Sequence, residues 1–365
     1  MDLNKLAEIS QGRLLGSSIP VDSYSIDTRT IKSKEIYIAL EGENYDGHEF
    51  ISEAALKGAA AAVVSKSIEV DIPHIIVDST HEFMKNIADY NRSKFNGKVI
   101  GITGTNGKTS TKQIVSNLLN ENELCHKTLG NKNNQIGVPY SLLTLRERYK
   151  YSVIEMGTSE PGEIEILNNQ VKPNIAAITN VSKGHLEGLR DTESIAKEKG
   201  NILNFCSDSG IAYLPRDSEF FDFWSKKTNA KEIFSFGIHK DADFRVTNTK
   251  IDIEGNLTHF NLHNDGQIEE ISINGIGMHN SLNAALSIAI SLHLGIKMQT
   301  IKERLTAIDL PKRRLTVTKS LNGSTMIDDT YNSNPASLKN ALDSLEKVDK
   351  TKVCILGEMK ELGPE

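Results

Sequence analysis

Apolar runs and helical repeats alternate along the chain from residue 98 onward. Val99–Ile102 and Tyr151–Met156 are short apolar runs typical of strands that are buried on both faces, and Ala176–Asn180 repeats the pattern. Between the first two runs, Thr109–Leu119 has the apolar spacing of a helix. This alternation predicts an α/β fold in which helices cover both faces of a parallel sheet and ligands bind at the carboxyl ends of the strands.

The first 80 residues have shorter elements separated by turns, which predicts a small mixed domain. A helix over residues 80–96 is expected to follow it. The elements expected within this domain are strands at Ser25–Arg29, Glu35–Leu40, Ala60–Ser65 and His74–Val77, and a helix at Glu49–Lys57 that Gly58 closes.

Residues 210–275 are β-rich, and Ser281–Leu294 is a predicted helix that ends at Gly295. After residue 310 a new unit begins, and it is expected to hold strands at Leu315–Thr318, Thr325–Asp328 and Lys352–Leu356 and a helix at Ala336–Leu345. Roughly 50 residues are too few to close an α/β domain, so the third domain is expected to be incomplete. The expected domains are therefore residues 1–82, 83–310 and 311–365.

Composition and charge narrow the class of protein. The chain is 38% hydrophobic and 25% charged, as in globular proteins. Its formal net charge of −6 argues against nucleic-acid binding, which needs a basic face. No apolar run approaches the roughly 18–20 residues of a membrane span. Cys125, Cys206 and Cys354 have no paired spacing, so we expect reduced thiols in a cytoplasmic protein. We also expect a monomer without membrane insertion.

Residues 101–112, Gly-Ile-Thr-Gly-Thr-Asn-Gly-Lys-Thr-Ser-Thr-Lys, join a predicted strand to a predicted helix. Such a junction directs backbone N–H groups and the positive end of a helix toward one point, where phosphate binds. Lys108 can supply a positive charge to the β- and γ-phosphates, and the Thr109 hydroxyl can bind Mg²⁺. The pattern predicts ATP and Mg²⁺ as cofactors, and the alternative is a glycine-rich structural turn. The residues expected to bind the nucleotide are Gly104, Thr105, Asn106, Gly107, Lys108, Thr109 and Ser110.

Ile102 stands where the general eight-residue nucleotide loop has its first glycine. The segment instead resembles the shorter loop of the Mur ligase family, and further segments resemble that family in the same order along the chain. They are Asp27-Thr28-Arg29, Asp46-Gly47-His48, the loop 130–139, Glu155-Met156-Gly157, Thr179-Asn180 with His185-Leu186-Glu187, Gly277–Asn283 and Asp328–Pro335. The resemblance implies a three-domain architecture with a small mixed N-terminal domain, a central P-loop domain with a parallel sheet, and a Rossmann-like C-terminal domain that is incomplete here.

Glu155 and His185 each follow a predicted strand on the rim that carries the phosphate loop, where they can hold a second Mg²⁺. The alternative is a capping glutamate and a surface histidine, but the family has metal ligands at these positions. Lys199 matches a lysine that is carbamylated in several members, a change that turns a cation into a carboxylate-like Mg²⁺ ligand. An ordinary surface lysine is the alternative, and Asn201 stands where the family usually has Glu. The resemblance implies that Lys108, Glu155, His185 and Lys199 take part in catalysis.

The resemblance also assigns residues to the binding of ATP and of a sugar nucleotide. Asn283 is expected to bind adenine, Asp329 the ribose hydroxyls, and Arg314 the nucleotide at the hinge; each could instead be a capping or surface residue. The residues implied to bind a sugar nucleotide are Asp27, Thr28, Arg29, Asp46, His48, Asn133 and Asn134.

The implied activity is ATP-dependent amide formation through an acyl phosphate, in cytoplasmic peptidoglycan precursor synthesis. The carboxylate belongs to UDP-N-acetylmuramoyl-tripeptide and the amine to D-alanyl-D-alanine. The alternatives are a sibling ligase for another amino acid or a folate, a nucleotide-binding fragment that is inactive because the third domain is short, and a small-molecule kinase. We expect that a longer third domain would restore any turnover that this chain lacks.

Overall fold

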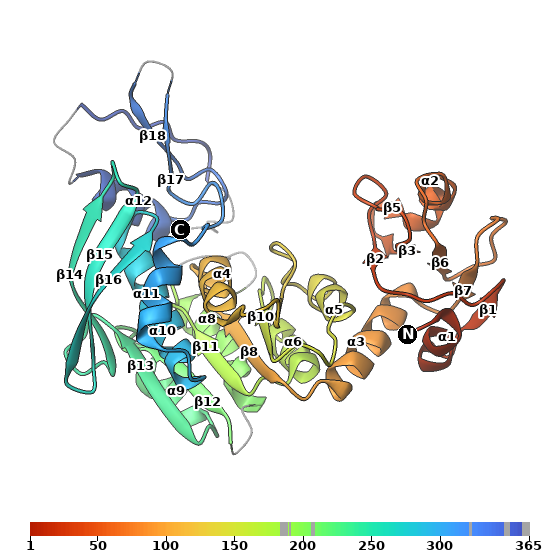
Figure 1. Ribbon diagram of the computed structural model, residues 1–365, viewed down its shortest axis with the longest axis horizontal. Coiled ribbons are helices and arrows are strands. Elements are labelled where there is room, and N and C mark those ends of the chain that lie inside the picture. Colours follow the sequence, from red (N-terminus) through yellow and green to blue (C-terminus); the bar gives the residue numbers. More distant parts are fainter. Residues whose placement is uncertain (183–188, 190, 206–208, 321–322, 347–350, 360–365) are drawn as a thin grey trace. The chain divides into compact units, whose positions relative to one another are not determined.

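The computed structural model describes residues 1–182, 189, 191–205, 209–320, 323–346 and 351–359 (Figure 1). It divides into two compact units, the first made of residues 1–96 with 135–148 and the second of residues 97–134 with 149–365. The expected boundary between residues 82 and 83 falls inside helix α3, Thr80–Lys94, which belongs to the first unit. The return of residues 135–148 to this unit is a tertiary feature that no local pattern reveals.

The first unit has a five-stranded sheet in the order β1-β7-β6-β3-β2, parallel except at the β1–β7 pair. Its core includes Ile38, Val63 and Ile75 from the sheet and Ile87 from α3. The expected helix at Glu49–Lys57 begins as a 3₁₀ turn, and only the beginning of Ser25–Arg29 forms a strand. The bounds are α1 Leu3–Ser10, β1 Arg13–Leu15, β2 Tyr24–Ser25, β3 Ile36–Ile38, β4 Glu41–Gly42, β5 Tyr45–Asp46, η1 Gly47–Phe50, α2 Ile51–Leu56, β6 Ala61–Val64, β7 His74–Ile76 and α5 Gly137–Leu142.

The second unit is built on a nine-stranded sheet in the order β16-β15-β14-β13-β12-β11-β8-β10-β9. The strands from β9 to β14 in this order are parallel, and β15 and β16 add an antiparallel edge. The strand bounds are β8 Lys98–Thr103, β9 Cys125–Lys127, β10 Tyr151–Glu155, β11 Ile175–Ile178, β12 Ile211–Pro215, β13 Glu232–Gly237, β14 Phe244–Asp252, β15 Leu257–Asn264 and β16 Gln267–Asn274.

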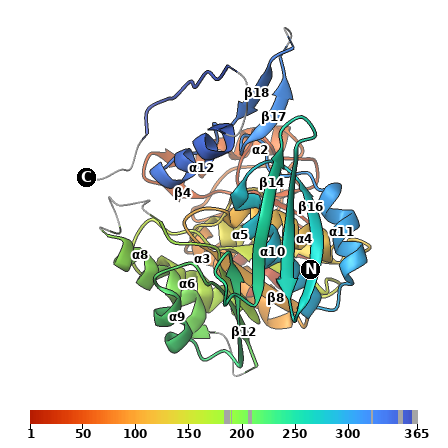
Figure 2. The same ribbon diagram turned by 90° about the vertical axis from the view of Figure 1, so that its left-hand side faces the viewer.

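Helices lie on both faces of this sheet, which confirms the predicted α/β class (Figure 2). Alternate residues of β8 show why the strand is apolar throughout. Ile100 and Ile102 pack in the cluster beneath α4 and α10, whereas Gly101 faces Met156 and Ile202 on the other side. The helical bounds are α4 Lys108–Leu119, α6 Glu163–Val171, α8 Thr192–Lys199, η2 Gly200–Phe205, α9 Phe221–Lys227, α10 Met278–His293 and α11 Met298–Thr306.

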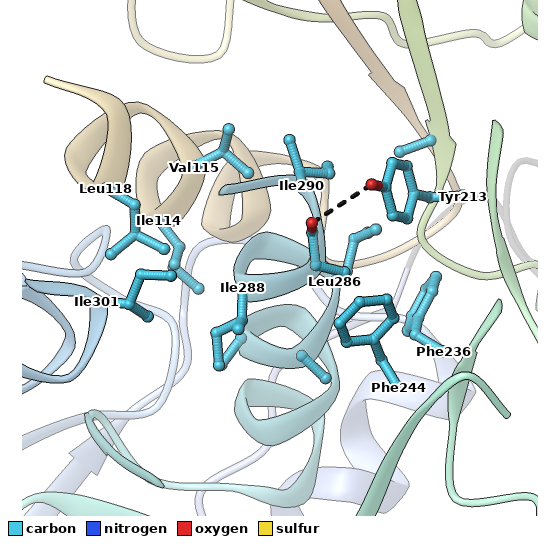
Figure 3. Packing of buried hydrophobic residues seen from close by; sticks show 14 of the residues in the cluster. Ile114, Val115, Leu118, Tyr213, Phe236, Phe244, Leu286, Ile288, Ile290 and Ile301 are labelled. Carbon is cyan, nitrogen blue, oxygen red and sulfur yellow. Dashed lines mark hydrogen bonds between the residues drawn. The ribbon is translucent and has the colours of Figure 1, made fainter. Parts of the chain in front are cut away.

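Helix α10 is buried along almost its whole length and packs beside α4 (Figure 3). Tyr213 donates from its hydroxyl to the Ala289 carbonyl at 3.3 Å, which satisfies a polar group inside this core. The small residues Ala284 and Ala285 are fully buried and allow the close packing. Gly295 ends the helix with φ +85, as predicted.

The last part of the chain forms the hairpin β17 Thr316–Lys319 and β18 Thr325–Asp328, followed by α12 Pro335–Glu346. The strand predicted over Lys352–Leu356 is not formed. A strand needs ladder hydrogen bonds to a neighbour, and over the described part of this segment no ladder exists; Val353 and Ile355 are 80% and 93% exposed. None of the helices within the described ranges has the length and apolarity to cross a membrane.

Candidate functional site

The turn between β8 and α4 has the geometry of an anion-binding loop. Gly104 and Gly107 adopt φ +148 and +80, a region that favours glycine. Gly107 occupies the N-cap of α4 and contributes no side-chain hydrogen bond to the first turn. The first N–H groups of α4 therefore have no capping side chain from Gly107, and they lie at the positive end of the helix dipole, where an anion can bind.

A second segment, which follows β11, holds this loop in place. Asn180 accepts from two loop amides, through its carbonyl from Thr105 N at 2.9 Å and through Oδ1 from Asn106 N at 3.0 Å. Thr179 donates from Oγ1 to the Asn106 carbonyl at 2.6 Å. These contacts fix the loop before any ligand binds, which reduces the ordering that binding requires.

We expect Gly104→Ala to weaken nucleotide binding at least tenfold, because a Cβ atom there would lie 1.8 Å from Thr179 Oγ1. The loop or the β11 segment must shift to relieve this overlap. The matched control is Gly266→Ala, which also has a positive φ, +74, but open space around the added carbon. Calorimetric titration with ADP checks the prediction, and equal affinities in both variants would contradict it.

Lys108 is the first residue of α4 and donates from Nζ to the carbonyls of Gly104 at 2.8 Å and Thr105 at 3.0 Å. Its ammonium therefore lies within the loop. Burial lowers the pKa of Lys108; the Glu155 carboxylate opposes this shift and the Arg314 guanidinium adds to it. An incoming phosphate would offer the ammonium a stronger partner than two neutral carbonyls.

Glu155, at the end of β10, is 1% exposed and lies beside the phosphate loop. Its Oε1 accepts from Thr109 Oγ1 at 3.0 Å and from Asn133 Nδ2 at 2.7 Å. Its Oε2 has no hydrogen-bond partner among the described residues, and Lys112 Nζ lies 3.5 Å from it. A buried carboxylate oxygen without a hydrogen bond, next to a threonine hydroxyl, is a donor set that suits Mg²⁺.

Two of these contacts were not anticipated. Asn133 was expected to bind substrate, but its amide is bound to Glu155. Lys112 was not singled out, although it lies four residues after Lys108 and therefore on the same face of α4. That spacing was the available signal.

Asn283 lies on α10 beside the loop, since a Cβ atom on Gly107 would be 2.5 Å from Asn283 Oδ1. The residue is 5% exposed, and in the described part of the chain its Nδ2 has no partner. A buried amide donor without a partner is uncommon in folded proteins and suits a ligand that supplies an acceptor. Ser110, also named from the sequence, is buried in the first turn of α4.

Arg314 reaches the loop from the last part of the chain. It donates from Nη2 to Thr109 Oγ1 at 3.3 Å, and its guanidinium lies over the Tyr331 ring at 4.1 Å. Asp329 accepts from Leu315 N at 3.1 Å, and burial raises its pKa. Both predicted nucleotide contacts are therefore in the second unit with the loop; the Tyr331 contact was not predicted.

Lys199 ends α8 and is 1% exposed. Burial lowers its pKa well below the ordinary value, and the charge of Lys108 lowers it further, while Glu198 opposes the shift. Glu198 accepts from the amides of Gly162 and Ile164, both at 2.8 Å, and so attaches α8 to the start of α6. Lys199 is therefore a buried amine rather than a surface lysine. His185 and Cys206 lie outside the described residues.

The residues expected to bind a sugar nucleotide fall in two places. Asp27, Thr28, Arg29, Asp46 and His48 belong to the first unit, whereas Asn133 and the exposed Asn134 belong to the second. Asp27 forms an ion pair with Arg29 at 2.7 Å, and the Arg29 side chain is 86% exposed. Thr28 is buried, and its carbonyl accepts from Lys57 Nζ at 2.9 Å.

Glu41, Asp46 and His48 cluster closely enough to suggest a metal site. Ser65 N donates to His48 Nε2 at 2.9 Å, so the ring proton is on Nδ1, which faces Asp46 Oδ1 at 2.6 Å. A hydrogen bond from Lys66 and others from His48 hold the pKa of Asp46 well below its usual range. The cluster is therefore a hydrogen-bonded network in which Asp46 is already paired with the Lys66 ammonium.

Comparison with known proteins identifies the family. Three Mur ligase domains match the chain in order: the catalytic domain over residues 20–92, the middle domain over 102–291 and the glutamate ligase domain over 313–365. A UDP-N-acetylmuramoyl-tripeptide--D-alanyl-D-alanine ligase of Buchnera aphidicola is 36% identical over 365 residues, which cover 100% of this chain and 80% of the relative.

Solved structures agree with this comparison. A MurF from Acinetobacter baumannii has a TM-score of 0.87 and 29% identity, covering 99% of this chain and 80% of that chain. A MurF ligase from Thermotoga maritima, solved in complex with ADP, has a TM-score of 0.81 and 26% identity, covering 94% and 79%. With a phosphate loop, a buried carboxylate and three domain matches in order, the chain belongs to the Mur ligase family and has that family's α/β architecture.

Proposed function

We propose that this chain uses Mg-ATP to join D-alanyl-D-alanine to the carboxylate of UDP-N-acetylmuramoyl-tripeptide, through an acyl phosphate. The observation that carries the proposal is the meeting of the Glu155 carboxylate and the Thr109 hydroxyl, 3.0 Å apart, at the uncapped start of α4. The two substrates are those in the name of the Buchnera relative, and the ADP-bound Thermotoga structure supports the nucleotide. We further propose that the protein is a cytoplasmic monomer that takes part in peptidoglycan precursor synthesis.

The reaction brings a carboxylate to the γ-phosphate of ATP, so two anions must approach each other. At 4 Å their repulsion is roughly 4 kcal/mol for each pair of charges at an effective dielectric constant of 20. Bound Mg²⁺ supplies positive charge between them. Lys108, which two loop carbonyls hold in place, and the first N–H groups of α4 would stabilise the charge on the phosphoryl group.

Metal ligands are proposed at four positions. Thr109 and Glu155 are hydrogen-bonded to each other, and Lys199 of α8, once carbamylated, and His185 would supply the other ligands. At the nucleoside, Asn283 would bind the adenine edge through its unpartnered amide, and Asp329 the ribose. Arg314, which donates to Thr109 Oγ1 at the start of α4, would contact the nucleotide.

The sugar-nucleotide peptide is proposed to contact Asp27, Thr28, Arg29, Asp46 and His48 in the first unit. The exposed guanidinium of Arg29 suits the diphosphate, because a planar cation can bind phosphate oxygens in pairs. Asn134 would contact the peptide, and Asn133 would orient the Glu155 carboxylate rather than bind substrate itself.

Lys199 carries a separate prediction. A neutral amine attacks CO₂, and burial lowers the pKa of Lys199 and so favours its neutral form. In ¹³C-bicarbonate we expect a carbamate resonance that Lys199→Ala removes, together with about a hundredfold loss of turnover. The control is Lys197→Ala, which removes an exposed lysine on the same helix that is paired with Glu193. A carbamate signal that survives in Lys199→Ala would contradict the assignment.

Phosphate release tests the proposed function itself. We expect release from ATP only when the tripeptide nucleotide and D-alanyl-D-alanine are both present, and formation of an amide product by mass spectrometry. Release that needs no amine and leaves a stable phosphorylated product would indicate a kinase. Nucleotide binding without release would indicate a binding fragment, and another amino acid in place of the dipeptide would indicate a sibling ligase.

A further inference from the structure

Lys112 is a buried cation at the candidate metal site to which no role has been assigned. It lies one turn after Lys108 on α4 and is 2% exposed. Its Nζ lies 3.5 Å from Glu155 Oε2 and also donates to the carbonyl of Gly130. A buried ammonium is unfavourable unless charges and hydrogen bonds compensate it, so this position is specifically paired.

Both partners of Lys112 belong to the site. Glu155 Oε2 has no hydrogen-bond partner among the described residues. The nearby Lys112 ammonium compensates electrostatically for the hydration that this buried oxygen has lost. Gly130 begins the loop that carries Asn133, and Asn133 Nδ2 donates to the other oxygen, Glu155 Oε1, at 2.7 Å. The Lys112 ammonium therefore links α4 to the Glu155 carboxylate and to the loop of residues 130–139.

We propose that Lys112 is a positioning residue that acts as the counter-ion of Glu155 in the metal site. It holds Glu155 and the loop of residues 130–139 in place before Mg²⁺ arrives. It also lowers the affinity of the site for Mg²⁺. The proposal rests on the proposed function, in which Glu155 is a metal ligand. Its physical basis is that Lys112 and Mg²⁺ interact with the same carboxylate. Lys112 stabilises that carboxylate without metal and repels the metal when it binds. A lysine that served only to fill space would affect both states equally.

The test measures melting temperature with ADP, first in EDTA and then across a MgCl₂ titration. We expect Lys112→Met to melt several °C below the parent in EDTA, because it leaves the Glu155 charge unpaired. In Mg²⁺ it should recover most of the difference, with an apparent Mg²⁺ affinity about tenfold tighter than the parent's. The comparison variant is Lys127→Met: Lys127 Nζ donates to Gln113 Oε1 at 3.1 Å, and its charge acts on Lys112, but within the described residues it forms no ion pair with Glu155. This variant should gain much less from Mg²⁺ than Lys112→Met does.

A neutral background separates charge from packing. In Glu155→Gln, the further change Lys112→Met should lower the melting temperature much less than it does in the parent, because no unpaired carboxylate remains. If Lys112→Met alone does not fold, the double variant should still fold, and failure of both would overturn the proposal.

Two further results distinguish this inference from the proposed function. An equal Mg²⁺-induced shift in Lys112→Met and the parent would overturn the counter-ion role and leave Glu155 as a metal ligand. If Glu155→Gln keeps the full Mg²⁺-induced shift of the parent, the proposed metal site is wrong and the counter-ion proposal falls with it.

Discussion

Replacement of Lys108 by alanine is expected to weaken binding of Mg-ADP by about 10- to 100-fold and to reduce amide formation by about 10²–10³-fold. Among the described residues, the ammonium has the neutral carbonyls of Gly104 and Thr105 as its hydrogen-bond acceptors. With nucleotide it gains charged phosphate oxygens, and their interaction strengthens as charge builds up in the transition state. Turnover should therefore fall further than affinity.

Calorimetry and the phosphate-release assay measure the two effects. The control is Lys150→Ala, which removes an exposed lysine that follows the loop by about forty residues and precedes β10. Lys108→Ala should remain folded. It loses only two hydrogen bonds to neutral carbonyls, and it removes a buried charge whose desolvation is unfavourable. Unchanged Mg-ADP affinity in Lys108→Ala would contradict the assignment of this loop as the phosphate site.

Glu155→Gln is expected to reduce amide formation by about 10²–10³-fold and to raise the Mg²⁺ concentration needed for half-maximal activity. The amide keeps the size of the side chain but removes the charge that a divalent cation needs. ADP affinity measured in EDTA should change little, because Glu155 lies behind the Thr109 hydroxyl and is not itself a phosphate-binding donor.

Glu165→Gln is the matched control, since Glu165 is an exposed carboxylate on α6 in the same unit. A Mg²⁺ titration of activity compares the two variants. If Glu155→Gln needs no more Mg²⁺ than Glu165→Gln, the carboxylate is structural and its bond to Thr109 only orients the start of α4.

Local patterns were sufficient for the elements around the nucleotide loop. The β8 prediction is confirmed because a strand buried on both faces must be apolar throughout, and α4 begins at Lys108 because glycine ends the loop. The strand predicted over Lys352–Leu356 is absent because a strand depends on a neighbour as well as on its own residues.

The site was only partly accessible from local patterns. The residues that bind the loop or its neighbours could be named, but their partners could not. Asn133 donates to Glu155, 22 residues away in the chain, a contact that no local pattern predicts. The sequence pattern does not indicate a role for Lys112, because that role depends on contacts with Glu155 and Gly130, which belong to other elements.

The amino-acid sequence by itself determined the family, the phosphate loop and the chemistry of the residues around it, because glycines, a lysine and hydroxyls at fixed spacing suffice to define an anion site. Only the tertiary structure decided which charges are buried and what compensates them. Lys199 is buried with a lowered pKa, and Lys112 lies beside the Glu155 carboxylate, in both cases because of neighbours distant in the chain. Desolvation depends on everything packed around a charge, and no local pattern contains that information.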